Sequence, residues 1–260
     1  TGDDAVTFEH PRIDTDATHG SGCALASAVA ARLARGDDLR DAVAASAAFM
    51  ERAVRYSLDV GEGPGAVHHL VALRERADRQ PTQEAVESVV RSFVERDAAP
   101  LVPEVGMNVV GATPYAERVG ETAAVEGRIT RTMSGVQPNR GVRFGASSHV
   151  ARFLLAAREF DPALRFAVNC RFDERVADAL AALDGLVAEF DRDAEPADVK
   201  AEEGSTMQWG ARRAFEAADE TPAAVVDRGE VGKEAIVKLL AADAETLRKR
   251  TFAVLDALER

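Results

Sequence analysis

The sequence predicts an α/β protein whose larger part is a three-layer α/β/α domain with a mixed β-sheet, preceded by a mostly helical segment. From about residue 105 onward, short apolar runs alternate with helical patterns, which is typical of a sheet covered by helices on both faces. Several connections are short enough for antiparallel pairing, so the sheet should be mixed. Hydrophobic residues make up 46% of the 260-residue chain, enough to bury a full core.

The N-terminal segment is expected to contain one strand and two helices. Residues 5–9 (AVTFE) predict a short strand, the apolar run 24–33 predicts a helix that ends at Gly36, and residues 39–57 predict a second helix. Residues 74–82 (RERADRQPT) are charged, contain Pro81 and lack apolar periodicity. We therefore expect an N-terminal part at 1–75, a linker at 76–82 and a larger domain at 83–260.

In the larger domain, Thr82 is expected to cap a helix over 83–96, and residues 105–111 predict a strand. Pro114 opens a predicted helix to residue 119, because proline lacks only an N–H that the first turn does not need. Two short strands, near 127–132 and 141–144, are joined by a polar loop. The remaining expected elements are helix 148–160, strand 164–169, helix 174–183, strand 186–190, helical turn 196–202, a helix from Ser205 or Thr206, strands 223–226 and 235–240, and helix 245–258.

Composition excludes several classes of protein. The chain has 44 acidic against 32 basic residues, a net charge of −12, which argues against nucleic-acid binding. Only 4 of the basic residues are lysine, so we expect a halophilic source, although codon bias explains the arginine preference as well. No run of about 18 apolar residues occurs, so no membrane span is expected.

The chain begins at Thr1 without a basic and apolar leader, which indicates a fragment or a processed chain. Its two cysteines, Cys23 and Cys170, are far apart and have no CxxC or CxxH partner, so neither a disulfide framework nor a zinc site is expected. A reducing cytoplasm fits best.

One stretch, RFGASSHVARFLLAAREF at 143–160, carries the strongest local signal for a binding site. Ser147 or Ser148 can cap a helix, which places His149 in the first turn, where free N–H groups and the helix dipole can hold a phosphate. Arg143 adds positive charge beside that end. The alternative is an ordinary capped helix with a surface histidine.

Other candidates are polar residues at strand ends and one local excess of arginine. Four arginines between residues 128 and 143 favour an oxyanion ligand, with solvated surface arginines as the alternative. Asn108, inside an apolar strand, is either a satisfied core amide or a ligand contact. Asn169, Asp191, Ser205 and Lys233 each follow a strand or open a helix, where α/β sheets expose ligand groups. Asp191 has no second carboxylate at a metal-ligand spacing, so Mg²⁺ should arrive with a diphosphate.

Two groups of motifs resemble known families. THGSGC at 18–23 and GEGPGAVHH at 61–69 resemble the C-terminal end of the hydroxymethylpyrimidine phosphate kinases of the ribokinase superfamily. The resemblance covers about 70 residues and implies a mostly helical ribokinase-like remnant in which Gly20, Gly22 and Cys23 form an anion hole, with Ser21 in place of threonine. Binding of ATP requires βαβ units ahead of this motif, so we expect no kinase activity from this chain.

A longer series of motifs resembles the archaeal thiamine-phosphate synthase domain, which is commonly fused behind such a kinase. In chain order, these motifs are PEVGMN, GATPYAE, EGRITR, RFGASSHVAR, EEGSTMQWG and DRGEVGKE. The resemblance implies a transferase that joins hydroxymethylpyrimidine diphosphate, with its Mg²⁺, to hydroxyethylthiazole phosphate. It implies catalytic roles for Arg128 and His149. The substrate and phosphate contacts are then expected to come from Asn108, Arg143, Ser147, Ser148, Asn169, Asp191, Ser205, Thr206 and Lys233. The sequence leaves three further possibilities open: the domain binds thiamine phosphates as a sensor without catalysis, it is a remnant with an inactive site, or it forms a homodimer.

Overall fold

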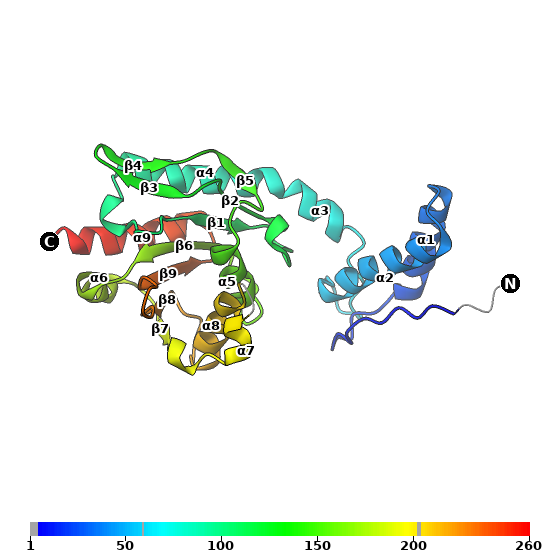
Figure 1. Ribbon diagram of the computed structural model, residues 1–260. Helices are drawn as coiled ribbons and strands as arrows, with labels where there is room; N and C mark the ends of the chain where they lie inside the picture. Colours follow the sequence, from blue (N-terminus) through cyan, green and yellow to red (C-terminus); the bar gives the residue numbers. More distant parts are fainter. Residues whose placement is uncertain (1–4, 59, 202–203) are drawn as a thin grey trace. The chain divides into compact units, whose positions relative to one another are not determined.

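The computed structural model describes residues 5–58, 60–201 and 204–260, so the end of the predicted helical turn at residue 202 lies outside it (Figure 1). The chain divides into two compact units, Thr1–Ala77 and Asp78–Arg260. Among the described residues, no helix combines the length and the apolar character that crossing a bilayer requires.

The first unit consists mainly of helices. These are α1 (Ser21–Ala34), α2 (Leu39–Arg55) and α3 (Val71–Ala77). Helix α2 begins where predicted because the Asp38 carboxylate accepts a hydrogen bond from the N–H of Asp41 at 2.9 Å. The predicted strand at residues 5–9 is wrong: this segment has no regular structure, and in the described part of the unit no strand lies beside it to complete a sheet.

The predicted linker at 76–82 is also wrong in its conformation, because α3 and α4 (Arg79–Glu95) fill nearly all of it. Pro81 lies in the first turn of α4, where a missing N–H costs nothing. Thr82 does not cap this helix. Its side chain is buried, and its hydroxyl accepts a hydrogen bond from Arg165 at 3.2 Å. The helix extends back through the charged segment because its apolar stripe from Val86 to Phe93 packs into the core.

The second unit is built on a seven-stranded sheet of order β5-β2-β1-β6-β9-β8-β7. The strands are β1 (Val109–Ala112), β2 (Thr122–Val125), β5 (Val142–Phe144), β6 (Phe166–Arg171), β7 (Val187–Phe190), β8 (Ala224–Asp227) and β9 (Ile236–Ala241). Strands β7 and β8 pair parallel and all other neighbours pair antiparallel, so the predicted mixed sheet is confirmed. A separate hairpin joins β3 (Ile129–Thr132) to β4 (Gly135–Pro138).

Helices cover both faces of this sheet, which confirms the three-layer architecture (Figure 1). One face packs against α4, α6 (Glu174–Ala179) and α9 (Ala244–Leu258), and the other against α5 (His149–Ala157) and α8 (Ser205–Glu216). Successive strand residues alternate between the two cores, as Val109 and Val110 do in β1. The smaller elements are α7 (Ala197–Ala201) and the 3₁₀ turns η1 (Ala99–Leu101), η2 (Val119–Glu121), η3 (Leu180–Ala182) and η4 (Arg192–Ala194).

The expected helix at 114–119 does not form, and β2 directly after it was not predicted. Residues 114–118 make turns, because the Glu121 carboxylate accepts a hydrogen bond from the N–H of Glu117 at 2.8 Å and so closes the chain back on itself. All four residues of β2 (TAAV) are buried, with Ala123 and Val125 in the core under α4 and Ala124 in the core under α5, so the strand shows no alternation of apolar and polar residues.

Close packing between α4 and the sheet depends on Gly111 in the middle of β1. A Cβ atom there would lie 2.7 Å from a methyl carbon of Val86 and 2.8 Å from the ring of Phe166. We expect Gly111→Val to lower the free energy of unfolding by about 1–3 kcal/mol, because both neighbours lie in a filled core. Urea denaturation measures the change. Gly120→Ala is the control, since a Cβ at Gly120 meets nothing within 4 Å; equal losses in both variants would contradict the packing argument.

Candidate active site

A cavity of about 380 Å³ opens at one end of the sheet, on the face covered by α5 and α8. Four neighbouring strands each contribute one polar residue to its lining: Asn108 precedes β1, Asn169 lies in β6, Lys238 in β9 and Asp227 ends β8. The residues two positions away on the same face of each strand are apolar and belong to the core under α5 and α8. They are Val110, Ala167, Leu240 and Val225. The polar row therefore marks the place where this core ends and the cavity begins.

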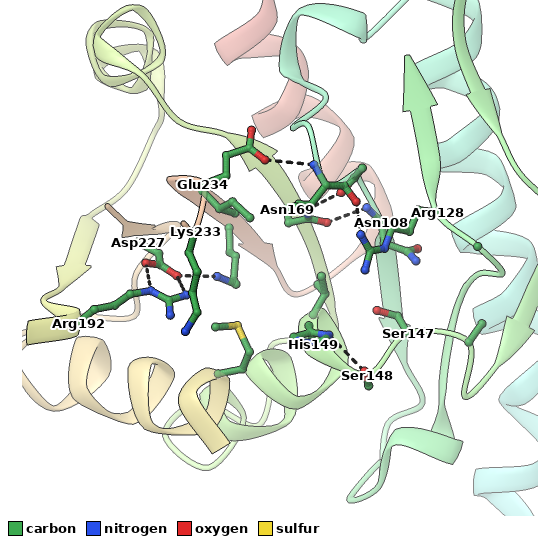
Figure 2. Close-up of a pocket in the computed structure, with 18 of the residues that line it drawn as sticks. Asn108, Arg128, Ser147, Ser148, His149, Asn169, Arg192, Asp227, Lys233 and Glu234 are labelled. Carbon is green, nitrogen blue, oxygen red and sulfur yellow. Dashed lines mark hydrogen bonds and ion pairs between the residues drawn. The ribbon is translucent and has the colours of Figure 1, made fainter. Parts of the chain in front are cut away.

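Asn108 and Asn169 support the right side of the cavity through hydrogen bonds to the backbone (Figure 2). The Asn108 side chain exchanges two bonds with the backbone of Val125, at 2.9 and 3.0 Å, and the backbone N–H of Asn108 donates to the side-chain oxygen Oδ1 of Asn169 at 2.7 Å. The Asn169 amide in turn donates to the Gly106 carbonyl at 3.1 Å. Of the two interpretations of Asn108, the satisfied core amide describes these bonds.

Arg128 is held at the cavity by an unusual backbone conformation. Its φ is +80°, a region that side chains other than glycine rarely adopt, and its guanidinium donates a hydrogen bond to the Val105 carbonyl. Gly106 is also left-handed, with φ +85°, and a Cβ there would come within 3.1 Å of the Arg128 side chain. The bond from Asn169 to Gly106 thus positions the segment against which Arg128 lies. Such strain is often kept where a side chain must be aimed.

His149 is the first residue of α5, as the sequence predicts. Ser148 occupies the N-cap position, yet its side chain makes no capping bond, and its hydroxyl lies 3.3 Å from Nδ1 of His149. Ser147, Ser148 and His149 all line the cavity. The predicted serine cap is therefore absent, which leaves the dipole end of a nine-residue helix facing the cavity with a histidine beside it.

A buried charged cluster forms the opposite side of the cavity. The Arg192 guanidinium donates two hydrogen bonds of 2.7 Å to the Asp227 carboxylate, which also accepts the N–H of Gly229 at 3.0 Å. The Lys238 ammonium lies 4.0 Å from Asp227 and 4.8 Å from the centre of the Phe153 ring. Burial lowers the pKa of Lys238 to about 8; Asp227 opposes this shift, and Arg192 adds to it. The bond to Asp227 raises the pKa of Arg192.

The cavity carries a positive balance in a strongly acidic chain. Its lining includes four cationic side chains, Arg128, Arg192, Lys233 and Lys238, and two carboxylates, Asp227 and Glu234. Glu234 is engaged, because its carboxylate accepts the N–H groups of Glu104 and Val105 at 2.9 and 3.1 Å. Within the described ranges, no three His, Cys, Asp or Glu residues gather as a metal site. The arrangement suits an anionic ligand.

Seven of the predicted site residues line this cavity: Asn108, Arg128, Ser147, Ser148, His149, Asn169 and Lys233. Four others do not. Arg143 is exposed in the edge strand β5 and pairs with Glu126 at 3.1 Å, and Asp191 accepts the N–H of Asp193 at 2.9 Å to cap η4. Ser205 donates to the Val199 carbonyl at 2.5 Å, and in α8 it is Met207, not Thr206, that lines the cavity.

Arg192, Asp227, Glu234 and Lys238 line the cavity but were not predicted. Lys238 carried the same signal as Asn108, a polar residue inside an otherwise apolar strand (AIVKLLA, 235–241). Asp227 ends the apolar run AAVVD (223–227), and Asn169 was predicted as a site residue because it likewise ends an apolar strand pattern. Arg192 had no such signal, because only the fold brings it to Asp227.

In the first unit, the predicted anion-hole residues lie at the start of α1. Gly20 has φ +82°, and it lines a shallow cavity together with the exposed Cys23 and with His69. Gly22 lines a neighbouring cavity beside His10. The three residues are thus at one helix start but face two hollows.

Comparisons with known proteins match two different families to the two structural units of the chain. Residues 85–251 match the family described as thiamine-phosphate synthase ThiN, and residues 1–68 match the phosphomethylpyrimidine kinase family. The bifunctional thiamine biosynthesis protein ThiDN of Methanocaldococcus jannaschii is 30% identical over 95% of this chain, which spans 56% of that relative's length. The thiamine-phosphate synthase ThiN of Methanothermobacter thermautotrophicus is 34% identical over 60% of this chain and 82% of its own length. A solved structure, the C-terminal domain of phosphomethylpyrimidine kinase, is 30% identical, with a TM-score of 0.65, over 68% of this chain and 99% of that one.

Proposed function

This chain belongs to the thiamine-phosphate synthase ThiN family, and from that premise we propose that it joins hydroxymethylpyrimidine diphosphate to hydroxyethylthiazole phosphate. The C–O bond to diphosphate breaks, a C–N bond to the thiazole nitrogen forms, and the products are thiamine phosphate and diphosphate. The observation that carries the proposal is that Arg128 and His149 line one cavity with a cationic surplus.

The chemistry asks the protein to hold a leaving anion. The thiazole nitrogen has a free lone pair, so no base is needed to make it a nucleophile. The departing diphosphate gains charge on the oxygen that leaves the pyrimidine methylene. Arg128, His149 and the N-terminus of α5 can donate hydrogen bonds to that anion from fixed positions. His149 either donates as a neutral imidazole or transfers a proton, and both roles stabilise the leaving group.

Magnesium enters this proposal only with the diphosphate. The two carboxylates of the cavity are engaged, Asp227 by Arg192 and Glu234 by backbone N–H groups, so they are poor ligands for a resident metal. A Mg²⁺ ion that arrives on the diphosphate can keep most of its waters. ATP belongs only to the kinase reaction of the N-terminal half.

Incubation of the protein with both substrates and Mg²⁺ tests the proposal, with thiamine phosphate as the measured product. Product formation that depends on both substrates supports an enzyme. If no product forms, calorimetry with thiamine phosphate separates the alternatives. Binding without turnover indicates a ligand sensor, and absence of both indicates a dead site.

His149→Asn separates the two roles of the histidine. Asparagine keeps a donor but cannot titrate, so we expect turnover to fall by roughly 10²-fold and the pH dependence of kcat near neutrality to flatten. The measurement is a pH–rate profile of both proteins. A profile of unchanged shape would exclude proton transfer by His149 and leave hydrogen bonding alone.

For the whole protein, we propose a second activity as a phosphomethylpyrimidine kinase, supported by the match of residues 1–68 and by the bifunctional relative. We place that remnant at residues 1–75 and propose that it has no kinase activity in this chain. Among the described residues its apolar core comprises Ala24, Met50, Ala53 and Val67 with two partly buried neighbours. We also propose a cytoplasmic enzyme of a halophilic archaeon, since both thiols are free and the chain is acidic and poor in lysine.

A further inference from the structure

We propose that Lys238 forms a second anion subsite of the cavity, which holds the monophosphate of the thiazole substrate apart from the diphosphate at Arg128 and His149. The assignment of these two ligands rests on the proposed function. The existence of a phosphate site at Lys238 rests on the structure of the charged cluster alone.

The Lys238 ammonium is buried without the contacts that a buried cation needs. The residue is 3% exposed and lines the cavity. Among the described residues its ion-pair partner is Asp227, whose nearer oxygen is 4.0 Å away, beyond hydrogen-bond distance. Its other close neighbour is the face of the Phe153 ring, at 4.8 Å. The ammonium lines the cavity and makes no side-chain hydrogen bond among the described residues, so a ligand oxygen in the cavity could accept from its three N–H donors.

Asp227 does not neutralise Lys238, because Arg192 already occupies it. Both carboxylate oxygens accept bonds from the guanidinium, and one of them also accepts the N–H of Gly229. The other carboxylates of the cluster, Glu230 at 3.5 Å and the buried Glu195, act on Arg192, so Lys238 has only a share of Asp227. Lys233, which also lines the cavity, is different: it is half exposed and pairs with Glu230 at 2.7 Å. The uncompensated charge of this side of the cavity is thus concentrated at Lys238.

The position of the cluster fits a second phosphate. Figure 2 shows Arg192, Asp227 and Lys233 on one side of the pocket, Asn108, Asn169 and Arg128 on the other, and His149 below. Lys238 in β9 is two strands from β1, a separation of roughly 10 Å at about 4.8 Å per strand. Substrates that each carry phosphate must hold these groups apart while the methylene carbon and thiazole nitrogen meet. Two separated cationic subsites provide that arrangement.

The protonation of Lys238 agrees with this role. With its pKa lowered to about 8, the side chain is still mostly an ammonium at neutral pH, and a bound phosphate favours that form further. The groups that face it are Asp227 of β8, Arg192 of η4 and, across the cavity, His149 of α5. Asp227 favours the ammonium, and Arg192 opposes it.

Calorimetry on the full chain tests the proposal with two probes, hydroxyethylthiazole phosphate and inorganic diphosphate. Lys238→Met keeps the length of the side chain and removes its charge. We expect monophosphate affinity to fall roughly 10- to 100-fold, the worth of a charged hydrogen bond, while diphosphate affinity changes by less than about threefold. Arg128→Ala should show the opposite pattern. Lys249→Met, on an exposed lysine of α9 that pairs with Glu245 and does not line the cavity, should leave both affinities nearly unchanged.

Several outcomes would overturn the subsite. These are an unchanged monophosphate affinity in Lys238→Met, an equal loss for both probes, or a loss of the same size in Lys249→Met. Lys238→Gln, a polar variant, is measured in parallel, and thermal melts show that the variants compared are folded. The titrations need no turnover, so they test the subsite independently of the proposed function. If the wild-type protein makes no thiamine phosphate, but Lys238→Met loses monophosphate affinity and Arg128→Ala loses diphosphate affinity, the subsite is supported and the proposed reaction is rejected.

Discussion

Arg128→Ala is expected to lower kcat for thiamine phosphate formation by about 10²–10³-fold, the usual worth of one preorganised donor to a developing anion. The physical reason is position. The guanidinium is fixed by its bond to the Val105 carbonyl and by the left-handed backbone at residue 128, so little reorganisation is needed when charge develops on the leaving oxygen. Steady-state assays with saturating substrates measure the loss.

Arg131→Ala is the matched control for Arg128→Ala, because Arg131 is exposed in β3 and does not line the cavity. It should keep nearly full turnover. Arg128→Lys should recover only part of the lost rate, since a lysine keeps the charge but not the two-pronged geometry of a guanidinium. Both variants should melt close to the parent protein. Near-normal turnover in Arg128→Ala would remove this residue from the reaction.

The sequence predicted the elements whose pattern is long and periodic. Helices α5, α8 and α9 lie close to their expected bounds, because each carries an apolar stripe that packs on the sheet. Helix α2 also does so, because its apolar stripe packs against α1 within the first unit. The sequence-based prediction failed where specific contacts, and not an apolar pattern, determine the local structure. Strand β2 is four small residues buried on both faces. The turns at 114–118 depend on a local bond from the N–H of Glu117 to the carboxylate of Glu121, which no apolar pattern signals. Charged residues at the start of α4 obscured a helix whose apolar face begins only later.

The same distinction applies to the site. His149 and Asn108 could be found locally, because a helix start and a polar residue in an apolar strand are visible in a short window. Ser205 and Asp191 occupy equally suggestive positions, but their side chains serve local backbone groups. The pair of Arg192 and Asp227 is 35 residues apart in sequence and meets only because η4 follows β7, which lies parallel to β8. No sequence pattern predicts this contact.

Asp227→Ala is expected to lower the free energy of unfolding by about 3–5 kcal/mol, because it removes one partner of a buried ion pair and leaves the other charge uncompensated. Here two cations, Arg192 and Lys238, lose the same carboxylate, and the N–H of Gly229 loses its acceptor. Urea denaturation at pH 7 measures the change. Asp191→Ala removes an exposed carboxylate that only caps η4, so it should cost no more than about 1 kcal/mol.

The pH dependence of stability distinguishes this account from a simple loss of packing. The folded-state pKa of Lys238, about 8, lies below its ordinary value of 10.5, so between these values the unfolded chain binds more protons than the folded one. Stability contributed by this group therefore rises with pH across that window. Asp227 is the neighbour that favours the ammonium, so its removal lowers the folded pKa of Lys238 further and the rise should begin at lower pH in Asp227→Ala. Adding Lys238→Met should abolish this rise in the variant and recover part of its lost stability, because one uncompensated cation is then gone; a double variant with unchanged pH dependence would show that the buried charges are not the cause.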